Sequence, residues 1–201
     1  CQADDMTSLP FEIVNSKMYD LLTDLIQKHR TTLVFTNTRS GTEHVVFKLK
    51  ERGITDIEAH HGSMSKESRI SVEDMLKDGM LKAVVSSTSL ELGIDIGHID
   101  LVCQIGSPKS VAKALQRIGR SGHDVGKASQ GRLIAFDNDD LVECAVLCHA
   151  AHRKHIDRVT IPKNSLDVLA QTLVGMSLEK KWKIDDAYAL IKRSYCYNDL
   201  D

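Results

Sequence analysis

Two arginines and two glycines lie close together in the stretch Gln116-Arg117-Ile118-Gly119-Arg120-Ser121-Gly122-His123. The guanidinium group keeps its positive charge and offers a planar set of donors that fits phosphate oxygens. Glycine lets the backbone turn tightly because it has no Cβ. The spacing therefore predicts a phosphate clamp at the end of a helix. An equally frequent alternative for such a pattern is a helix that carries surface arginines and ends in glycine.

Basic residues gather around this stretch, although the whole chain has a formal net charge of −2. Between residues 107 and 132 the single acid is Asp124, and the basic residues are Lys109, Lys113, Arg117, Arg120, Lys127 and Arg132. A one-sided patch of this kind is typical of polyphosphate binding. No aromatic residue interleaves it, so we expect contact with a nucleic-acid backbone rather than base stacking.

A second candidate for phosphate contact is rich in hydroxyl groups. Ser86-Ser87-Thr88-Ser89 follows an apolar run and precedes Gly93 and Asp95. The hydroxyls can donate to a phosphodiester backbone, and the Asp95 carboxylate can accept from a sugar hydroxyl. The alternative is a capped loop, because serine and threonine also collect at helix starts. On motif frequency alone, that alternative is the favoured one.

The elements that would position these residues follow a regular order. Predicted strands cover residues 31–36, 56–59, 82–86, 101–105 and 132–136, and predicted helices begin at Ser16, Ser40, Ser65, Ser110 and Asp139. Residues 1–15 are expected to form an irregular lead-in. Strands that alternate with helices through short connections predict a doubly wound α/β domain with a mostly parallel sheet.

Ligands of such sheets bind at the carboxyl ends of the strands. In this chain those ends carry Asn37-Thr38-Arg39, His61-Gly62-Ser63, Ser87-Thr88-Ser89 and Gly106-Ser107. All four segments are polar, small or basic. Topology and chemistry thus indicate the same edge of the sheet, which favours a binding site over a helix with incidental surface arginines.

After Ile156 the alternation stops. Ile161-Pro162 interrupts it, and two helical patterns follow within residues 166–176 and 184–191 without a strand between them. We therefore predict one domain over residues 1–158 and the incomplete beginning of a helical domain over residues 159–201. The chain opens with Cys1 rather than methionine, and we interpret it as part of a longer protein.

Composition excludes several classes of protein. The chain has 201 residues, of which 42% are hydrophobic, enough for a substantial core. Its five cysteines are scattered without a CxxC pair, which argues against a secreted disulfide framework and favours a reducing, intracellular compartment. No apolar run in the sequence reaches membrane-spanning length.

One cluster in the sequence has the composition of a metal site. Cys144, Cys148 and His152 are spaced four apart on one predicted helix. Zinc sites usually draw ligands from two segments, so we favour the alternative of core-facing cysteines with a histidine at the helix end. Trp182 is likewise expected in the core of the helical domain rather than on a base-stacking surface.

Four stretches occur in the order of motifs IV, IVa, V and VI of superfamily 2 helicases, at residues 33–39, 60–63, 87–95 and 116–123. The amino-acid sequence of residues 89–97 and 104–108 resembles that of the large helicase-related (Lhr) proteins of archaea and bacteria. The resemblance covers nearly the whole chain. It implies the second RecA-like domain of a helicase, followed over residues 166–200 by the start of a winged-helix domain.

The resemblance implies roles at an ATP site shared with another domain. Arg120 matches the arginine finger that reaches the γ-phosphate, and Gln116 and Arg117 would shape the same edge. Asp95 matches a residue near the ATP ribose, with Gly93 keeping the loop tight. His123 is a departure, because broader superfamily 2 patterns have a second arginine there, although histidine fits the Lhr subgroup. Histidine titrates near neutral pH and is not a permanent phosphate contact.

Other positions match contacts to the nucleic-acid backbone. They are Asn37, Thr38, Arg39, His61, Gly62 and Ser63, together with the hydroxyls of Ser87 and Thr88. The expected partner is DNA, with RNA or a DNA–RNA hybrid as alternatives. The implied location is intracellular and nucleoid-associated.

Two parts of a complete ATPase are missing from the sequence. It has neither a GxxxxGK[ST] loop nor an acidic Mg²⁺-holding motif, and the near-match Gly122–Ala128 is one residue short between its glycines. ATP and Mg²⁺ would then be held mainly by an N-terminal RecA-like domain of the same protein, and this chain alone should not hydrolyse ATP. The alternative function is a non-catalytic RecA-like module that binds nucleic acid or protein.

Overall fold

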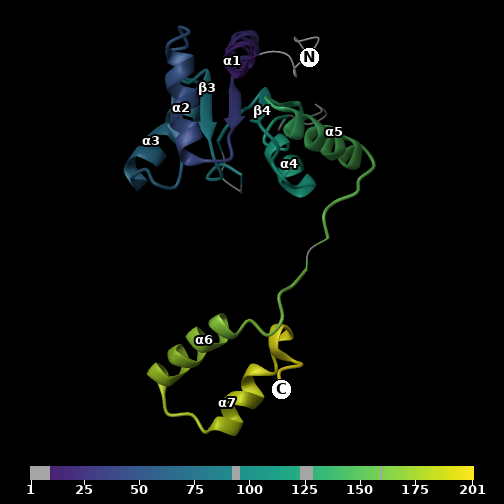
Figure 1. Cartoon of the computed structure of the whole chain (residues 1–201). Coiled ribbons are helices and arrows are strands. Elements are labelled where there is room, and N and C mark those ends of the chain that lie inside the picture. Colours follow the sequence, from purple (N-terminus) through teal and green to yellow (C-terminus); the bar gives the residue numbers. More distant parts are fainter. Residues whose placement is uncertain (1–9, 92–95, 123–128, 159) are drawn as a thin grey trace. The chain divides into compact units, whose positions relative to one another are not determined.

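The structure is a computed structural model that describes residues 10–91, 96–122, 129–158 and 160–201. It divides into two compact units, Cys1–Asp157 and Arg158–Asp201. Figure 1 shows their elements. The first unit holds the sheet and the second is helical.

The sheet of the first unit is parallel throughout. Its strands are β1 (Thr32–Phe35), β2 (Ile57–His60), β3 (Ala83–Ser86), β4 (Leu101–Ile105) and β5 (Gly131–Ile134), in the spatial order β2-β3-β1-β4-β5. Strands β1, β3 and β4 are buried along their whole length, as expected for apolar runs covered on both faces. The predicted doubly wound, mostly parallel sheet is confirmed.

Helices cover both faces of this sheet. Helices α1 (Phe11–Lys28) and α2 (Arg39–Lys50) share one core cluster with Val34 and Val85, and α3 (Lys66–Lys77) shares another with Leu33 and Phe35. Consecutive strand residues point to opposite faces, which explains why neighbours in β1 belong to different clusters. The unit is completed by α4 (Val111–Ile118) and α5 (Asn138–His152). In the described part of the chain, no helix combines the length and apolarity needed to cross a bilayer.

Two predicted helix starts were wrong. Helix α1 begins at Phe11, with Pro10 as its N-cap residue, so the apolar stripe starts before Ser16. Proline fixes a φ suited to a helix start, and here it ends the lead-in. Helix α2 is capped by Thr38 instead of Ser40, since the Thr38 side chain accepts a hydrogen bond from Gly41 N at 3.0 Å. A cap hydroxyl satisfies one of the free N–H groups of the first turn.

The second unit contains α6 (Leu166–Glu179), α7 (Ile184–Ile191) and a short 3₁₀ turn, η1 (Tyr195–Tyr197). The turn is tied back to the start of α6, because Tyr197 Oη donates to Ser165 O at 3.0 Å. Trp182 lies between the two helices in sequence, is partly buried and donates from Nε1 to Met176 O at 3.1 Å. The two helices that we predicted from periodicity are therefore present.

Gly131 provides a test of the packing between α4 and β5. A Cβ added there would lie 2.4 Å from Ile118 Cγ1, so we expect Gly131→Ala to force a shift and to lower the free energy of unfolding by about 1–3 kcal/mol. Urea denaturation of the chain measures it. Gly62→Ala is the matched control, because nothing lies within 4 Å of its added Cβ. Equal stabilities of the two variants would contradict the close approach.

Candidate functional site

The polar segments that follow β1, β2 and β3 lie side by side at one edge of the sheet. The register pairs Phe35 with Ser86 and His60 with Ser86, so the three strands end at the same level. The segments that begin at Thr36, His61 and Ser87 are therefore neighbours, as we predicted from the order of the strands. Most of their residues are exposed, from Asn37 to Arg39 and at Gly62, Ser63 and Thr88.

A hydrogen bond links the first two segments directly. Arg39 Nη1 donates to Ser63 Oγ at 2.6 Å. The His61 ring is held by two contacts: its Nε2 lies 2.7 Å from Glu43 Oε1, and its Nδ1 accepts from Ser63 N at 3.3 Å. Its ring is 9% exposed, so His61 shapes the loop and presents little surface of its own.

Asn37 and Thr38 have different surroundings. Asn37 Nδ2 donates to Ser107 O at 2.9 Å, which joins the end of β1 to the turn after β4. Thr38 uses its hydroxyl as the α2 cap and also lies 3.4 Å from Ser40 Oγ. Its hydroxyl therefore has a structural role whether or not a ligand is bound.

The hydroxyl-rich segment after β3 contains both buried and exposed residues. Ser87 is 4% exposed, and its carbonyl faces inward to accept from Arg117 Nη2 at 3.2 Å. Thr88 is exposed. Gly93 and Asp95, which we expected near the ATP ribose, lie outside the residues that the structure describes.

Arg117 is the centre of a buried network. The residue is 3% exposed, and its Nε donates to Glu91 Oε1 at 2.7 Å. Its Nη1 donates to Gln104 Oε1, and its guanidinium carbon lies 4.9 Å from the centroid of the Phe35 ring. A buried cation with a carboxylate, an amide and a carbonyl as partners is satisfied on every side. Arg117 therefore ties α4 to the ends of β1, β3 and β4.

The other members of the arginine–glycine stretch lie around the last turn of α4. Gln116 is exposed on this helix. Arg120 follows Gly119, the C-cap residue, and its backbone N donates to Arg117 O at 3.0 Å. Its Nε atom is enclosed and has no hydrogen-bond partner among the described residues. His123 lies outside the part of the chain that the structure describes.

Sequence reasoning missed two partners in this site, Glu91 and Gln104, and it expected the Ser89 hydroxyl at a phosphate, whereas that hydroxyl contacts His60. Gln104 gave a usable signal, because it is a polar residue inside the apolar run Leu101–Ile105. A buried amide needs partners, so its presence in a central strand indicates a network. Glu91 gave no comparable signal, since its contact with Arg117 depends on the fold.

His60 forms a second buried contact between two segments of the edge. Its Nδ1 lies 2.6 Å from Ser89 Oγ, and its Nε2 lies 3.0 Å from Glu73 Oε1. Burial lowers the pKa of His60, while the hydrogen bond and the charge of Glu73 oppose that shift. The neutral ring therefore joins the end of β2 to the loop after β3.

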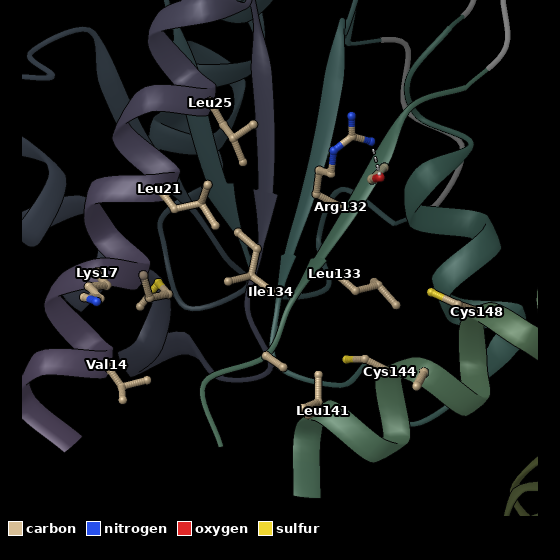
Figure 2. A pocket seen from close by; sticks show the side chains of 14 residues that line it. Val14, Lys17, Leu21, Leu25, Arg132, Leu133, Ile134, Leu141, Cys144 and Cys148 are labelled. Carbon is tan, nitrogen blue, oxygen red and sulfur yellow. Dashed lines mark hydrogen bonds between the residues drawn. The ribbon is translucent and has the colours of Figure 1, made fainter. Parts of the chain in front are cut away.

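Figure 2 shows an apolar groove away from these segments. Its volume is about 550 Å³. It lies between α1 and α5 over β5, and Leu21, Leu25 and Leu133 are among its walls. The sulfur atoms of Cys144 and Cys148 point toward it. Burial raises the pKa of the Cys144 thiol to about 11. Among the described residues, no group of three His, Cys, Asp or Glu side chains could hold a metal ion.

Comparison with known proteins assigns the chain to a family. The model of the "Helicase conserved C-terminal domain" matches residues 15–124, and that of the "Large helicase-related protein, winged helix domain" matches residues 149–201. The ATP-dependent helicase Lhr-Core of Methanocaldococcus jannaschii is 57% identical over 197 residues, or 98% of this chain and 23% of that protein. The chain belongs to the large helicase-related (Lhr) family. The resemblance drawn from the four motifs is confirmed.

This Lhr chain also matches solved structures. Mycobacterium smegmatis helicase Lhr bound to ssDNA and AMP-PNP is 39% identical, with a TM-score of 0.93 over 99% of the Lhr chain and 27% of that chain. DUF1998 helicase MrfA bound to DNA and AMPPNP is 28% identical, with a TM-score of 0.58 over 69% of the Lhr chain and 20% of that chain. The Lhr chain thus spans about a quarter of the length of its Lhr relatives. Its RecA-like fold, followed by a winged-helix region, is confirmed.

The buried pair of Arg117 and Glu91 predicts a large loss of stability when one partner is removed. We expect Arg117→Met to lower the free energy of unfolding by about 3–5 kcal/mol, because Glu91 would keep a buried, unpaired charge. The double variant Arg117→Met/Glu91→Leu should recover most of that loss. Urea denaturation of the chain measures both. A cost below about 1 kcal/mol for the single variant would show that the pair is solvated.

His60 predicts a dependence of stability on pH. Its pKa is lower in the folded chain than the usual value near 6.5, so the unfolded chain binds the additional proton. The free energy of unfolding should therefore fall as pH drops below about 6.5, by at most ~1.4 kcal/mol per pH unit from this residue. His60→Gln should flatten this slope, whereas His155→Gln, at an exposed position, should not. Parallel pH profiles for wild type and His60→Gln would refute the assignment.

Proposed function

We propose that this chain is the C-terminal motor half of an ATP-dependent helicase or translocase that acts on DNA. The observation that carries the proposal is that β1, β2 and β3 end at the same level, which brings the polar segments after them together, and that buried Arg117 joins these segments to α4. In support, the Mycobacterium smegmatis relative, at 39% identity, binds ssDNA and AMP-PNP. RNA and DNA–RNA hybrids are the alternative substrates.

The exposed part of the edge would hold the nucleic-acid backbone. Arg39, Asn37 and Thr88 offer donors there, and Gly62 leaves space for close approach. Ser63 would be shared between the backbone and Arg39, while His61 and Thr38 keep the loops in place. Ser87 would help to shape the loop and would not contact the backbone through its side chain, because that side chain is buried. Contacts of this kind fix the register of the strand without reading its bases.

Arg120 is proposed as the arginine finger. No hydrogen bond or ion pair joins its guanidinium to another described residue, so the group can take a phosphate oxygen without breaking such a contact. The group fits an ATP γ-phosphate, whose charge grows more diffuse during phosphoryl transfer and is stabilised by such a finger. Arg117 would hold α4 in place. Gln116, Gly93, Asp95 and His123 would complete the surface that faces ATP.

ATP and Mg²⁺ would be held mainly by an N-terminal RecA-like domain of the same protein. This sequence contains no GxxxxGK[ST] loop, so the chain alone should not hydrolyse ATP. The two domains would close on the nucleotide, and closure would bring Arg120 toward the transferring group. Opening after hydrolysis would let the loops of the edge shift along the backbone. The protein would work inside the cell, on the nucleoid.

The test of this function is Arg120→Ala in the full-length protein. An arginine finger contributes about 10³–10⁵ in rate, so DNA-stimulated ATP hydrolysis should fall at least about a thousandfold. Binding of single-stranded DNA, measured by fluorescence anisotropy, should change little. Arg153→Ala is the matched control, since that arginine is exposed after α5.

Retention of wild-type turnover by Arg120→Ala would remove the finger from this residue. A wild-type protein that binds DNA with no ATP hydrolysis would favour the non-catalytic RecA-like binding module instead. The chain alone, assayed beside the full-length protein, tests whether it is inactive by itself.

A further inference from the structure

A continuous chain of hydrogen bonds crosses the interior of the first unit. It starts at Asn37 on the exposed edge, where Oδ1 accepts from Gln104 Nε2 at 3.3 Å. Gln104 Oε1 in turn accepts from Arg117 Nη1. Arg117 continues to Glu91 and to the carbonyl of Ser87. The chain of hydrogen bonds therefore joins the proposed nucleic-acid edge to α4, the helix that Arg120 follows.

The direction of the middle link is fixed by chemistry. Gln104 is 1% exposed and lies on β4, which pairs with β1 on one side and β5 on the other. A guanidinium can donate but never accept, so Oε1 must face Arg117. The amide group must then face Asn37, and it also donates to Ile105 O at 2.9 Å. The side chain cannot flip without losing contacts at both ends.

This direction fixes Asn37 as well. Because Gln104 donates to Oδ1, the Nδ2 group of Asn37 must point the other way, where it donates to Ser107 O at 2.9 Å. Nδ2 carries a second hydrogen, and Asn37 is exposed. The orientation set by a buried glutamine thus presents a donor at the edge where a phosphate would lie.

We propose that Gln104 is a positioning residue that couples occupation of the nucleic-acid edge to the arginine turn of α4. The proposal rests on the proposed function, because it names how DNA binding regulates the same ATP site. A phosphate that draws the Asn37 amide outward moves the partner of Gln104 Nε2. Gln104 Oε1 is one of the acceptors that hold Arg117, and Arg117 O accepts from Arg120 N at 3.0 Å. Occupation of the edge therefore changes how the Arg120 turn is held.

Arg39 offers a matched comparison, because it lies on the same edge but outside this relay. Its hydrogen-bond partner is Ser63, on the loop after β2. If both residues simply hold phosphate, loss of either raises the DNA concentration that gives half-maximal stimulation of ATP hydrolysis. If the relay operates, loss of Asn37 also lowers the maximal rate at saturating DNA, while loss of Arg39 does not.

The experiment compares Asn37→Ala, Arg39→Ala and Gln104→Met in the full-length protein, with ATP turnover measured against single-stranded DNA concentration. We expect Asn37→Ala and Gln104→Met each to lower the maximal stimulated rate by about tenfold, a usual size for coupling between sites. Arg39→Ala should shift half-saturation alone. The double variant Asn37→Ala/Gln104→Met should be no slower than the slower single variant, because both remove one relay.

Three outcomes overturn the proposal. Equal maximal rates for Asn37→Ala and Arg39→Ala would show that Asn37 is a phosphate contact alone. Additive losses in the double variant would show that Gln104 acts by another route. Because Asn37 and Arg39 are both exposed, their alanine variants should fold. The comparison of their maximal rates therefore tests the relay even if Gln104→Met does not fold. A wild-type protein without DNA-stimulated turnover would instead refute the proposed function, and the coupling with it.

Discussion

The buried guanidinium of Arg117 is the constraint on which the site depends. A charge in this position must be paired, because an unpaired one would cost several kcal/mol. Its partners come from the loop after β3, from β4 and from the aromatic ring of Phe35 at the end of β1. Four segments that are far apart in sequence are thus held around one side chain. This is why segments that are not contiguous in the sequence are packed together in the structure.

The parts of the fold that sequence could predict are those set by local pattern. The strand Leu101–Ile105 was predicted with its observed bounds, since a short apolar run between turn residues leaves few alternatives. The start of α1 was wrong because Val14 extends the helical stripe toward Pro10. The arginine–glycine stretch was identified by its composition. The partners of Arg117 were not, because Glu91 and Gln104 meet it through sheet register, which the sequence of each segment does not contain.

Two chemically different surfaces result from this arrangement. The strand edge presents the exposed amide of Asn37, several hydroxyls and the guanidinium of Arg39. The turn that follows α4 presents Arg120, a partly buried arginine whose backbone N is held by Arg117 O. The buried side chains of Gln104 and Arg117 lie between the two surfaces.

The position of β1 at the centre of the sheet also has a consequence for synthesis of the protein. Thr32 pairs with Ala83 on one side and with Leu101 on the other, and both partners come later in the chain. At roughly 5–20 residues per second, the ribosome releases this apolar strand several seconds before its neighbours. Until then its open edges resemble those that aggregate in other proteins. Helix α1, which precedes β1 in the chain and packs in the same core cluster as Val34, is the first element that can cover this strand until β4 has emerged.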